Sequence, residues 1–158
     1  MTIRPCSLED WQALKQLRLA ALLDAPTAFG VSHLAAAAYT DQQWQERAAG
    51  PHPRFWLAWL DGEPVGMIGG GVSQKNRYNL IAMWTKPDVR GSGIAAQLVD
   101  AVKADALARG HASVFLDVAP DNERAARFYL KQDFAFIDEW EPLASHPHIQ
   151  VQTMLWRA

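Results

Sequence analysis

The sequence predicts a single α/β layered domain that covers residues 1–158. Short apolar runs of strand type alternate along the chain with amphipathic segments of helical period. At 158 residues, with 49% hydrophobic and 20% charged residues, the chain can bury one sizeable core. No repeat, low-complexity tract or linker divides it.

The N-terminal part is predicted to hold one strand and two helices. Residues 2–5 have strand character. Ser7-Leu8-Glu9-Asp10 resembles a capping box, with a hydroxyl three residues before an acid, and predicts a helix to about Leu23. Thr40-Asp41-Gln42-Gln43 repeats the pattern and predicts a second helix to about Ala49.

Three strands are predicted in the middle of the chain. The runs 55–60 and 65–72 flank Asp61-Gly62, which is a strong signal for a hairpin turn. Gly69-Gly70-Gly71 is unfavourable inside a strand and indicates a bulge or a close approach of another group to the backbone. A third strand is predicted over 79–85.

The C-terminal part alternates helices and strands. The predicted elements are a helix over 92–109, a strand over 113–118, a helix over 122–132 and strands over 134–140 and 150–156. Gly110 ends the first of these helices. The segment 141–149 contains two prolines and is predicted to be a loop. The whole pattern gives about seven strands and about four helices.

Composition excludes several classes of protein. The formal charge of −2 gives no basic surface for nucleic acid. No apolar run reaches the roughly 18 residues of a membrane span, and the N-terminus lacks the pattern of a secretion signal, so we expect a cytoplasmic protein. Cys6 is the only cysteine, which excludes an internal disulfide. No His, Cys or acidic cluster has the spacing of metal ligands, so no metal is expected.

The segment Gly91-Ser92-Gly93, between a strand and a helix, is the candidate binding motif. The first turn of a helix has free backbone N–H groups and carries about half a positive charge, and glycines let a diphosphate approach closely. The alternative is tight packing of helix on strand. A Walker P-loop and a Rossmann fingerprint both fit poorly, since Ile94-Ala95 follows and only two glycines are present.

Two segments together resemble the GNAT acetyltransferase superfamily. Lys86–Ala95 resembles its motif A, with Arg90, Gly93 and Ala95 in the three defined places. Asn122–Tyr129 resembles its motif B, with Asn, Ala and an aromatic-Tyr pair at matching spacing. Because the order of elements also matches, the resemblance extends over nearly the whole chain.

The resemblance departs at one place. Where the family usually has Gly-Phe after motif B, this chain has Asp133-Phe134. Glycine there would end the helix in a left-handed conformation, and aspartate adopts that conformation more readily than most residues. We therefore expect the turn to be kept.

The resemblance implies a fold and a ligand. The fold is a central, mixed, mostly antiparallel sheet whose fourth and fifth strands splay apart near Thr85 and Asp117. The ligand is acetyl-CoA as acyl donor. The implied contacts are the main chain of Met83, Trp84 and Thr85 to the pantetheine arm, Asn122 near the slot, and the amides of Arg90, Gly91, Ser92, Gly93, Ile94 and Ala95 to the pyrophosphate.

Tyr129 matches the family tyrosine that serves as general acid for the departing thiolate. The alternative is a packing tyrosine that merely hydrogen-bonds the cofactor. Cys6 has no histidine nearby in the sequence, which favours direct attack in a ternary complex over an acyl-enzyme.

The sequence leaves the general base open. Many relatives place a glutamate on the fourth strand, whereas this chain has Asn79 near that position, which is not a useful proton acceptor. The candidates that remain are Asp117, Glu63, His146 and His148. Asp117 can equally be a hydrogen-bonded structural residue.

By family analogy the acceptor is a primary amine of a small molecule or peptide, bound between 22–45 and 141–149. Phe29 and Trp44 are candidates for an apolar wall there, with core packing favoured for Trp44. The leading hypothesis is an acetyl-CoA-dependent N-acetyltransferase, with a homodimer possible. The alternatives are a non-catalytic acyl-CoA-binding or sensing module, or a longer acyl donor such as succinyl-CoA.

Overall fold

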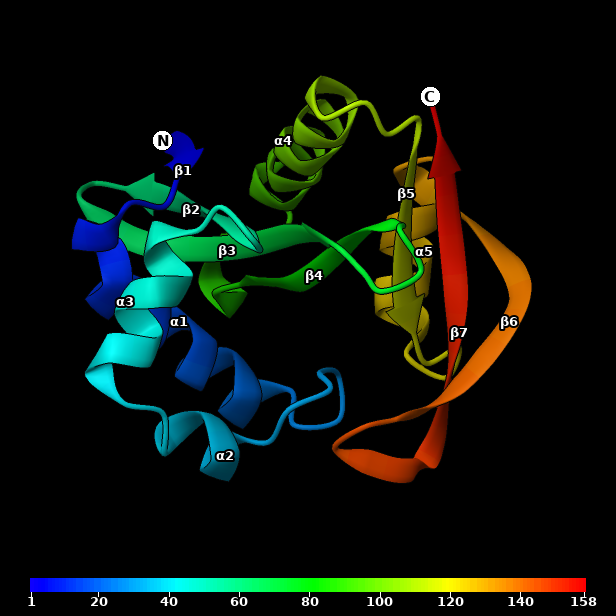
Figure 1. The fold of residues 1–158 in the computed structure, drawn as a ribbon, viewed down its shortest axis with the longest axis horizontal. Coiled ribbons are helices and arrows are strands. Elements are labelled where there is room, and N and C mark those ends of the chain that lie inside the picture. The colour runs from blue at the N-terminus through cyan, green and yellow to red at the C-terminus, as the bar shows by residue number, and fades with distance from the viewer.

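The computed structural model describes all residues 1–158 and contains one seven-stranded sheet with helices on both faces (Figure 1). The strands are β1 Thr2–Pro5, β2 Arg54–Leu60, β3 Glu63–Val72, β4 Tyr78–Thr85, β5 Ser113–Val118, β6 Ala135–Leu143 and β7 His146–Arg157. The helices are α1 Trp11–Asp24, α2 His33–Ala37, α3 Asp41–Ala49, α4 Ile94–Ala108 and α5 Glu123–Lys131, with 3₁₀ turns at Leu8–Asp10 and Pro87–Val89.

The strand order is β1-β2-β3-β4-β5-β7-β6, and every pair is antiparallel except β4 with β5, which is parallel. The predicted mixed, mostly antiparallel sheet is therefore confirmed. The parallel pair is joined only at Asn79 and Phe115, near the start of β4. Beyond that point the two strands diverge, as Figure 1 shows, and the predicted splay is present.

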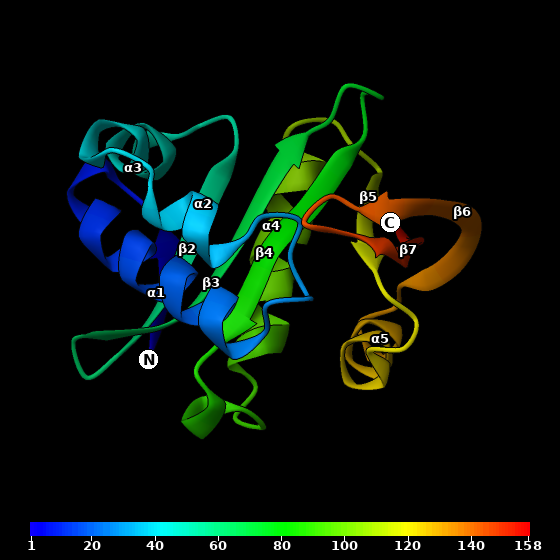
Figure 2. The same ribbon diagram turned by 90° about the horizontal axis from the view of Figure 1, so that it is seen from below.

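Two hydrophobic cores lie on opposite faces of the sheet. One contains the buried face of α4 with Leu98, Val99 and Val102, and the other contains α1 and α3 with Leu14, Leu17 and Trp44. Figure 2 shows α4 behind β3 and β4, with α1 and α2 in front of them. The apolar faces of these helices are the faces that pack on the sheet.

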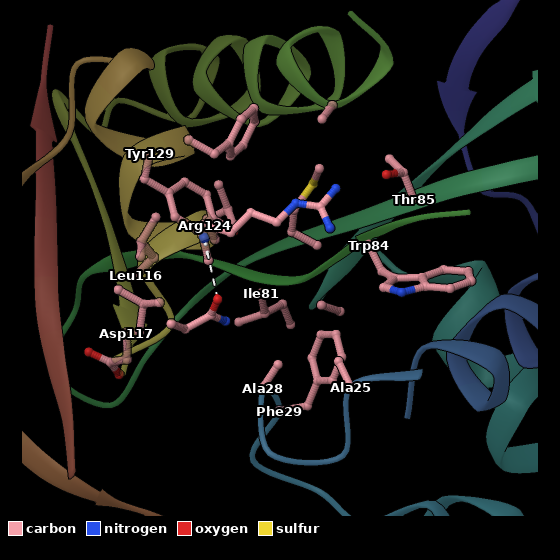
Figure 3. Close-up of a pocket in the computed structure, with 18 of the residues that line it drawn as sticks. Ala25, Ala28, Phe29, Ile81, Trp84, Thr85, Leu116, Asp117, Arg124 and Tyr129 are labelled. Atoms are coloured by element: carbon pink, nitrogen blue, oxygen red, sulfur yellow. Dashed lines mark hydrogen bonds between the residues drawn. The ribbon is translucent and has the colours of Figure 1, made fainter. Parts of the chain in front are cut away.

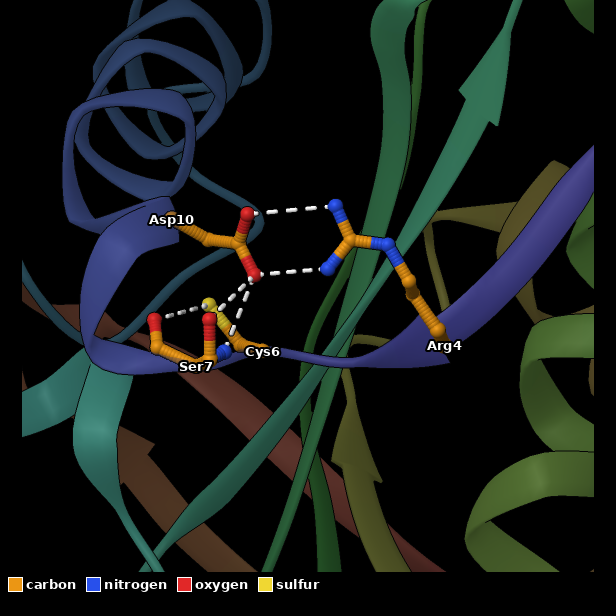
Figure 4. Close-up of polar contacts among 4 residues, drawn as sticks. All are labelled: Arg4, Cys6, Ser7 and Asp10. Carbon is orange, nitrogen blue, oxygen red and sulfur yellow. Dashed lines mark hydrogen bonds and ion pairs between the residues drawn. The ribbon is translucent and has the colours of Figure 1, made fainter.

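The start of α1 is fixed by polar contacts at the end of β1 (Figure 4). Asp10 accepts hydrogen bonds from the Ser7 amide at 2.9 Å and hydroxyl at 3.1 Å, which completes the predicted capping box. Arg4 donates to both carboxylate oxygens of Asp10, at 2.8 and 3.2 Å. Because one 3₁₀ turn comes first, α1 begins at Trp11.

The glycines of β3 confirm a close approach. A Cβ at Gly69 would lie 2.8 Å from the Phe55 ring, and one at Gly70 would collide with the Tyr78 ring. The register also shifts between Met67 and Gly69. These glycines therefore allow large aromatic rings to approach the backbone in the middle of the sheet.

Two sequence predictions were wrong. Helix α2 was missed, because five residues are too few for a helical period, although Ser32 caps it by accepting from the Ala35 amide at 3.1 Å. The predicted loop 141–149 is instead a hairpin of β6 and β7. Its prolines are tolerated because β6 is an edge strand and the ladder is irregular where β7 carries Pro147.

Candidate active site

A cavity of about 1560 Å³ opens where β4 and β5 separate (Figure 3). Its walls are the α1–α2 loop, β4, the end of β5, the first turns of α4 and α5, and the turn between β6 and β7. The predicted site residues that line it are Phe29, Met83, Trp84, Thr85, Arg90, Gly91, Gly93, Ala95, Asn122 and Tyr129. The structure thus brings residues from distant parts of the chain to one space.

Ser92 and Ile94 do not line the cavity. The Ser92 hydroxyl and amide both donate to the Val89 carbonyl, and the Ile94 side chain is in the core with 3% exposed. The side chains of Ser92 and Ile94 therefore stabilise the loop. Ile94 can contact a ligand through its backbone amide and not through its side chain.

The glycine loop is built to leave space over a helix N-terminus. Gly91 and Gly93 have φ angles of 82° and 89°, in the left-handed region that favours glycine, and a Cβ at either would meet nothing within 4 Å. No backbone carbonyl accepts a hydrogen bond from the amides of Gly93 to Ala96. Free amides facing an open space at the start of a 15-residue helix fit a pyrophosphate.

Asp24 is a site residue that sequence analysis missed. At the end of α1 it accepts hydrogen bonds from the Trp84 indole and from Arg90, both at 3.0 Å. These two bonds hold the pKa of Asp24 below its usual range. The contact ties α1 to the glycine loop across a sequence separation that no local pattern reveals.

Strand β4 carries a bulge at the cavity. Opposite the single residue Ile68 of β3 stand both Ala82 and Met83, and Ala82 has a φ of 57°. A bulge leaves backbone groups outside the ladder and turns them toward one side. The main chain at Ala82–Met83 is therefore available to a ligand between β4 and β5.

Asn122 and Tyr129 come from α5. The Asn122 side chain caps the helix by accepting from the Ala125 amide at 3.4 Å, and it also lines the cavity. Tyr129 lines the cavity and is 8% exposed, and its hydroxyl makes no hydrogen bond within the protein. Burial raises the pKa of Tyr129 well above its usual value, so the hydroxyl stays protonated at neutral pH.

Beside them, Arg124 extends from α5 into the cavity without an ion-pair partner (Figure 3). An unpaired guanidinium at this edge adds positive potential near the glycine loop. Nothing in the spacing of the helix distinguished this arginine from its neighbour Arg127, which pairs with Glu123 at 3.1 Å.

Phe29 lies on the opposite wall of the cavity, where its carbonyl accepts a hydrogen bond from Ser145 in the β6–β7 turn at 2.7 Å. That bond fastens the α1–α2 loop to the hairpin. Trp44 is 1% exposed and lies away from the cavity, so its interpretation as a core residue is confirmed.

Two carboxyl groups, those of Asp117 and Glu141, lie on the β5 side of the cavity. Asp117, on β5, accepts a hydrogen bond from Thr153 at 2.7 Å, and its carboxyl is within hydrogen-bonding reach of Glu141 on β6. This neighbour, with burial second, raises the pKa of Glu141. Asn79 lies beside them, at the single contact of β4 with β5. Glu141 was missed as an individual residue because only the register of β6 brings it here.

The other base candidates lie elsewhere. Glu63, His146 and His148 do not line the cavity, and His146 approaches the Ser145 hydroxyl at 2.9 Å. Cys6 is also outside it, and burial raises the pKa of its thiol to about 12, which makes it a poor nucleophile.

No three His, Cys, Asp or Glu side chains gather as a metal site. No helix has the length and apolarity to cross a membrane.

Comparison with known proteins places the chain in a family. Residues 13–134 match the model of the Acetyltransferase (GNAT) family. The splayed strands and the glycine loop at the start of α4 lie within these residues. The chain is a member of this family, whose members use acetyl-CoA. The resemblance drawn from the two sequence motifs is confirmed.

The curated relatives and the solved structures that resemble this chain are also acetyltransferases. The chain is 32% identical over 84 residues to an acetyltransferase of Pectobacterium atrosepticum, covering 53% of this chain and 59% of that protein. It is 33% identical over 84 residues to one of Sodalis glossinidius, covering 53% of this chain and 58% of that protein. The match thus spans less than two thirds of these relatives.

The fold matches a ribosomal-protein-alanine N-acetyltransferase from Brucella melitensis with a TM-score of 0.78, 16% identity and full coverage of both chains. It also matches a putative streptothricin acetyltransferase from Bacillus anthracis, solved with acetyl coenzyme A. That match has a TM-score of 0.61 and 17% identity, and it covers 69% of this chain and 64% of the other.

Proposed function

We propose that the protein is an N-acetyltransferase that transfers an acetyl group from acetyl-CoA to a primary amine of a small molecule or peptide. The observation that carries the proposal is the cavity itself. It joins free amides over a glycine loop, a bulged strand where β4 and β5 separate, and a buried tyrosine whose hydroxyl has no hydrogen-bond partner in the protein. Acetyl-CoA supplies the acyl group as a thioester.

The donor is held by main-chain groups in this proposal. The amides of Gly93, Ile94, Ala95 and Ala96 bind the pyrophosphate, helped by the dipole of α4. The main chain of β4 from Met83 to Thr85, which lines the cavity, takes the pantetheine arm, and the amides at the bulge stabilise negative charge on the acetyl oxygen.

The acceptor enters from the side of Phe29 and the two carboxyl groups. An amine attacks only when neutral, so a base must take a proton from its ammonium form. We assign this role to Glu141, in its ionised form, with Asp117 beside it, because Asn79 cannot serve. The nitrogen then bonds to the acetyl carbon, the carbon–sulfur bond breaks, and the Tyr129 hydroxyl gives its proton to the thiolate. The second proton, which the nitrogen loses as it becomes an amide, goes to the Tyr129 phenolate and restores the hydroxyl.

The test is release of free CoA thiol from acetyl-CoA with a panel of primary amines, with mass spectrometry to show the acetylated product. Turnover on at least one amine supports the proposal. Tight acetyl-CoA binding without turnover on any amine would instead indicate a non-catalytic acyl-CoA-binding module. Succinyl-CoA in the same assay tests for a longer donor, and sedimentation tests the proposed homodimer.

A further inference from the structure

Arg18, in the middle of α1, is a charged residue of the cavity that the proposed mechanism does not use. Its guanidinium carbon lies 4.9 Å from the centre of the Phe29 ring, and Ser145 donates a hydrogen bond to the Phe29 carbonyl. It precedes Asp24 by six residues, or about 9 Å along the helix axis. Arg18 is therefore separate from the contacts of the glycine loop.

Arg18 has no counter-ion in the protein. Its Nη1 atom is buried without a hydrogen-bond partner, and none of the ion pairs of the chain includes it. Its charged neighbour is Arg47, which repels it. Burial, with this repulsion second, lowers the pKa of Arg18 to about 10, so the residue is still charged at neutral pH.

Such an arrangement is unfavourable unless something supplies an anion. A buried charge is normally paired and hydrogen-bonded, and stacking on one aromatic ring offsets only part of its desolvation. The other buried side-chain nitrogens without partners, on Trp44 and Trp59, are neutral and lie away from the cavity. Arg18 alone combines a charge, an unpaired buried nitrogen and a place in the cavity wall.

We propose that the acceptor amine carries an anionic group, a carboxylate or a phosphate, which pairs with Arg18 when the acceptor binds. This inference rests on the proposed function. The acceptor then spans the cavity from α1, where its anion meets Arg18, to β5 and β6, where its amine meets Asp117 and Glu141. Each end of the acceptor faces a group of opposite charge.

The Arg18 guanidinium determines whether the site prefers an anionic acceptor over a neutral one. It binds either kind of anion through two parallel hydrogen bonds, whereas a neutral analogue leaves it unpaired and desolvated. A site built to hydrogen-bond a group rejects the analogue that lacks it. We therefore expect an acceptor to bind at least about tenfold more tightly than its neutral analogue.

The experiment measures binding directly, so that it does not depend on turnover. Calorimetry on the CoA-bound protein compares ω-amino carboxylic acids of increasing length with their primary amides, and aminoalkyl phosphates with the matching amino alcohols. The two series separate carboxylate from phosphate. The same measurements are made on Arg18→Met and on the control Arg47→Met, which removes a neighbouring charge outside the cavity.

We expect at least one anionic member to bind about tenfold or more tightly than its neutral partner in the wild type and in Arg47→Met. Arg18→Met should abolish that difference and leave CoA affinity unchanged. Its melting temperature should equal or exceed that of the wild type, since an unpaired, partly buried charge is removed. Equal binding of both members of every pair, or a preference that survives Arg18→Met, overturns the proposal. Absence of turnover with selective binding refutes only the proposed enzymatic activity.

Discussion

Asp24 and Arg90 form an ion pair at 3.0 Å that joins the end of α1 to the glycine loop. The same carboxylate accepts the Trp84 indole proton, so one acidic group orients two residues of the proposed donor site. A negative charge beside a pyrophosphate site opposes the binding of phosphate, and it also neutralises the arginine that motif A supplies.

We predict that Asp24→Asn binds CoA about twofold to fivefold more tightly at low salt, by up to about 1 kcal/mol, the range of a partly exposed ion pair. The amide oxygen still accepts from Trp84, while the charge of Arg90 becomes free for phosphate. Calorimetry at low and high salt checks this, since screening should shrink the gain. Asp88→Asn is the control, an exposed acid near Arg90 with no ion pair. Weaker binding by Asp24→Asn would mean that the carboxylate chiefly positions Arg90.

Replacing Gly93 by valine should abolish detectable CoA binding. Its Cβ would stand in the open space over the free amides, and a β-branched residue is strained at a φ of 89°. Gly110→Val is the matched control, because Gly110 has a φ of 85°, also meets nothing within 4 Å, and lies at the other end of α4. Both variants should lose similar stability, so calorimetry that shows equal loss of CoA affinity in both would contradict the assigned loop.

Tyr129→Phe should lower kcat by about a hundredfold, within the usual range for loss of a general acid, with little change in CoA affinity. The ring and its packing on Phe134 are kept, and only the unpartnered hydroxyl is lost. Steady-state kinetics and calorimetry separate the two effects, with Tyr39→Phe as a control outside the cavity. Near-normal kcat would reduce Tyr129 to a packing residue.

The pH profile should report the carboxyl pair. Glu141 must be ionised to accept a proton and its pKa is raised, so kcat/KM should fall as pH decreases through a value above 4.5, the ordinary pKa of glutamate. In Asp117→Asn the raising neighbour is replaced by an amide that donates to Glu141, so this acidic limb should move to lower pH. Asp138→Asn, on β6 outside the cavity, should leave it in place. If the acidic limb of the kcat/KM profile does not move in Asp117→Asn, Glu141 is not the base.

The predictable part of the molecule is the part encoded locally. Capping residues, periodicity and turn signals predicted the order of most elements, and glycines at a helix start predicted a loop that lines the cavity. The cavity residues that the sequence did not reveal are brought there by tertiary packing and strand pairing. Asp24, Arg18 and Glu141 look like ordinary polar positions along the chain, and only the packing of α1 and the pairing of β6 bring them to the cavity.

The turn after α5 holds Asp133 in a left-handed conformation. Asp133 has a φ of 70°, as expected for the place where the family usually has glycine, and the Phe134 amide donates to the Tyr129 carbonyl at 3.1 Å. Asp133→Gly should relieve the left-handed strain and raise the free energy of unfolding by about 0.5–1 kcal/mol, after allowing for the greater flexibility of glycine in the unfolded chain. Asp133→Ala should lower it by about 1 kcal/mol, because alanine lacks a side chain that favours this conformation. Urea denaturation measures both. A less stable Asp133→Gly would show that attraction between Asp133 and the nearby Lys103 outweighs the strain.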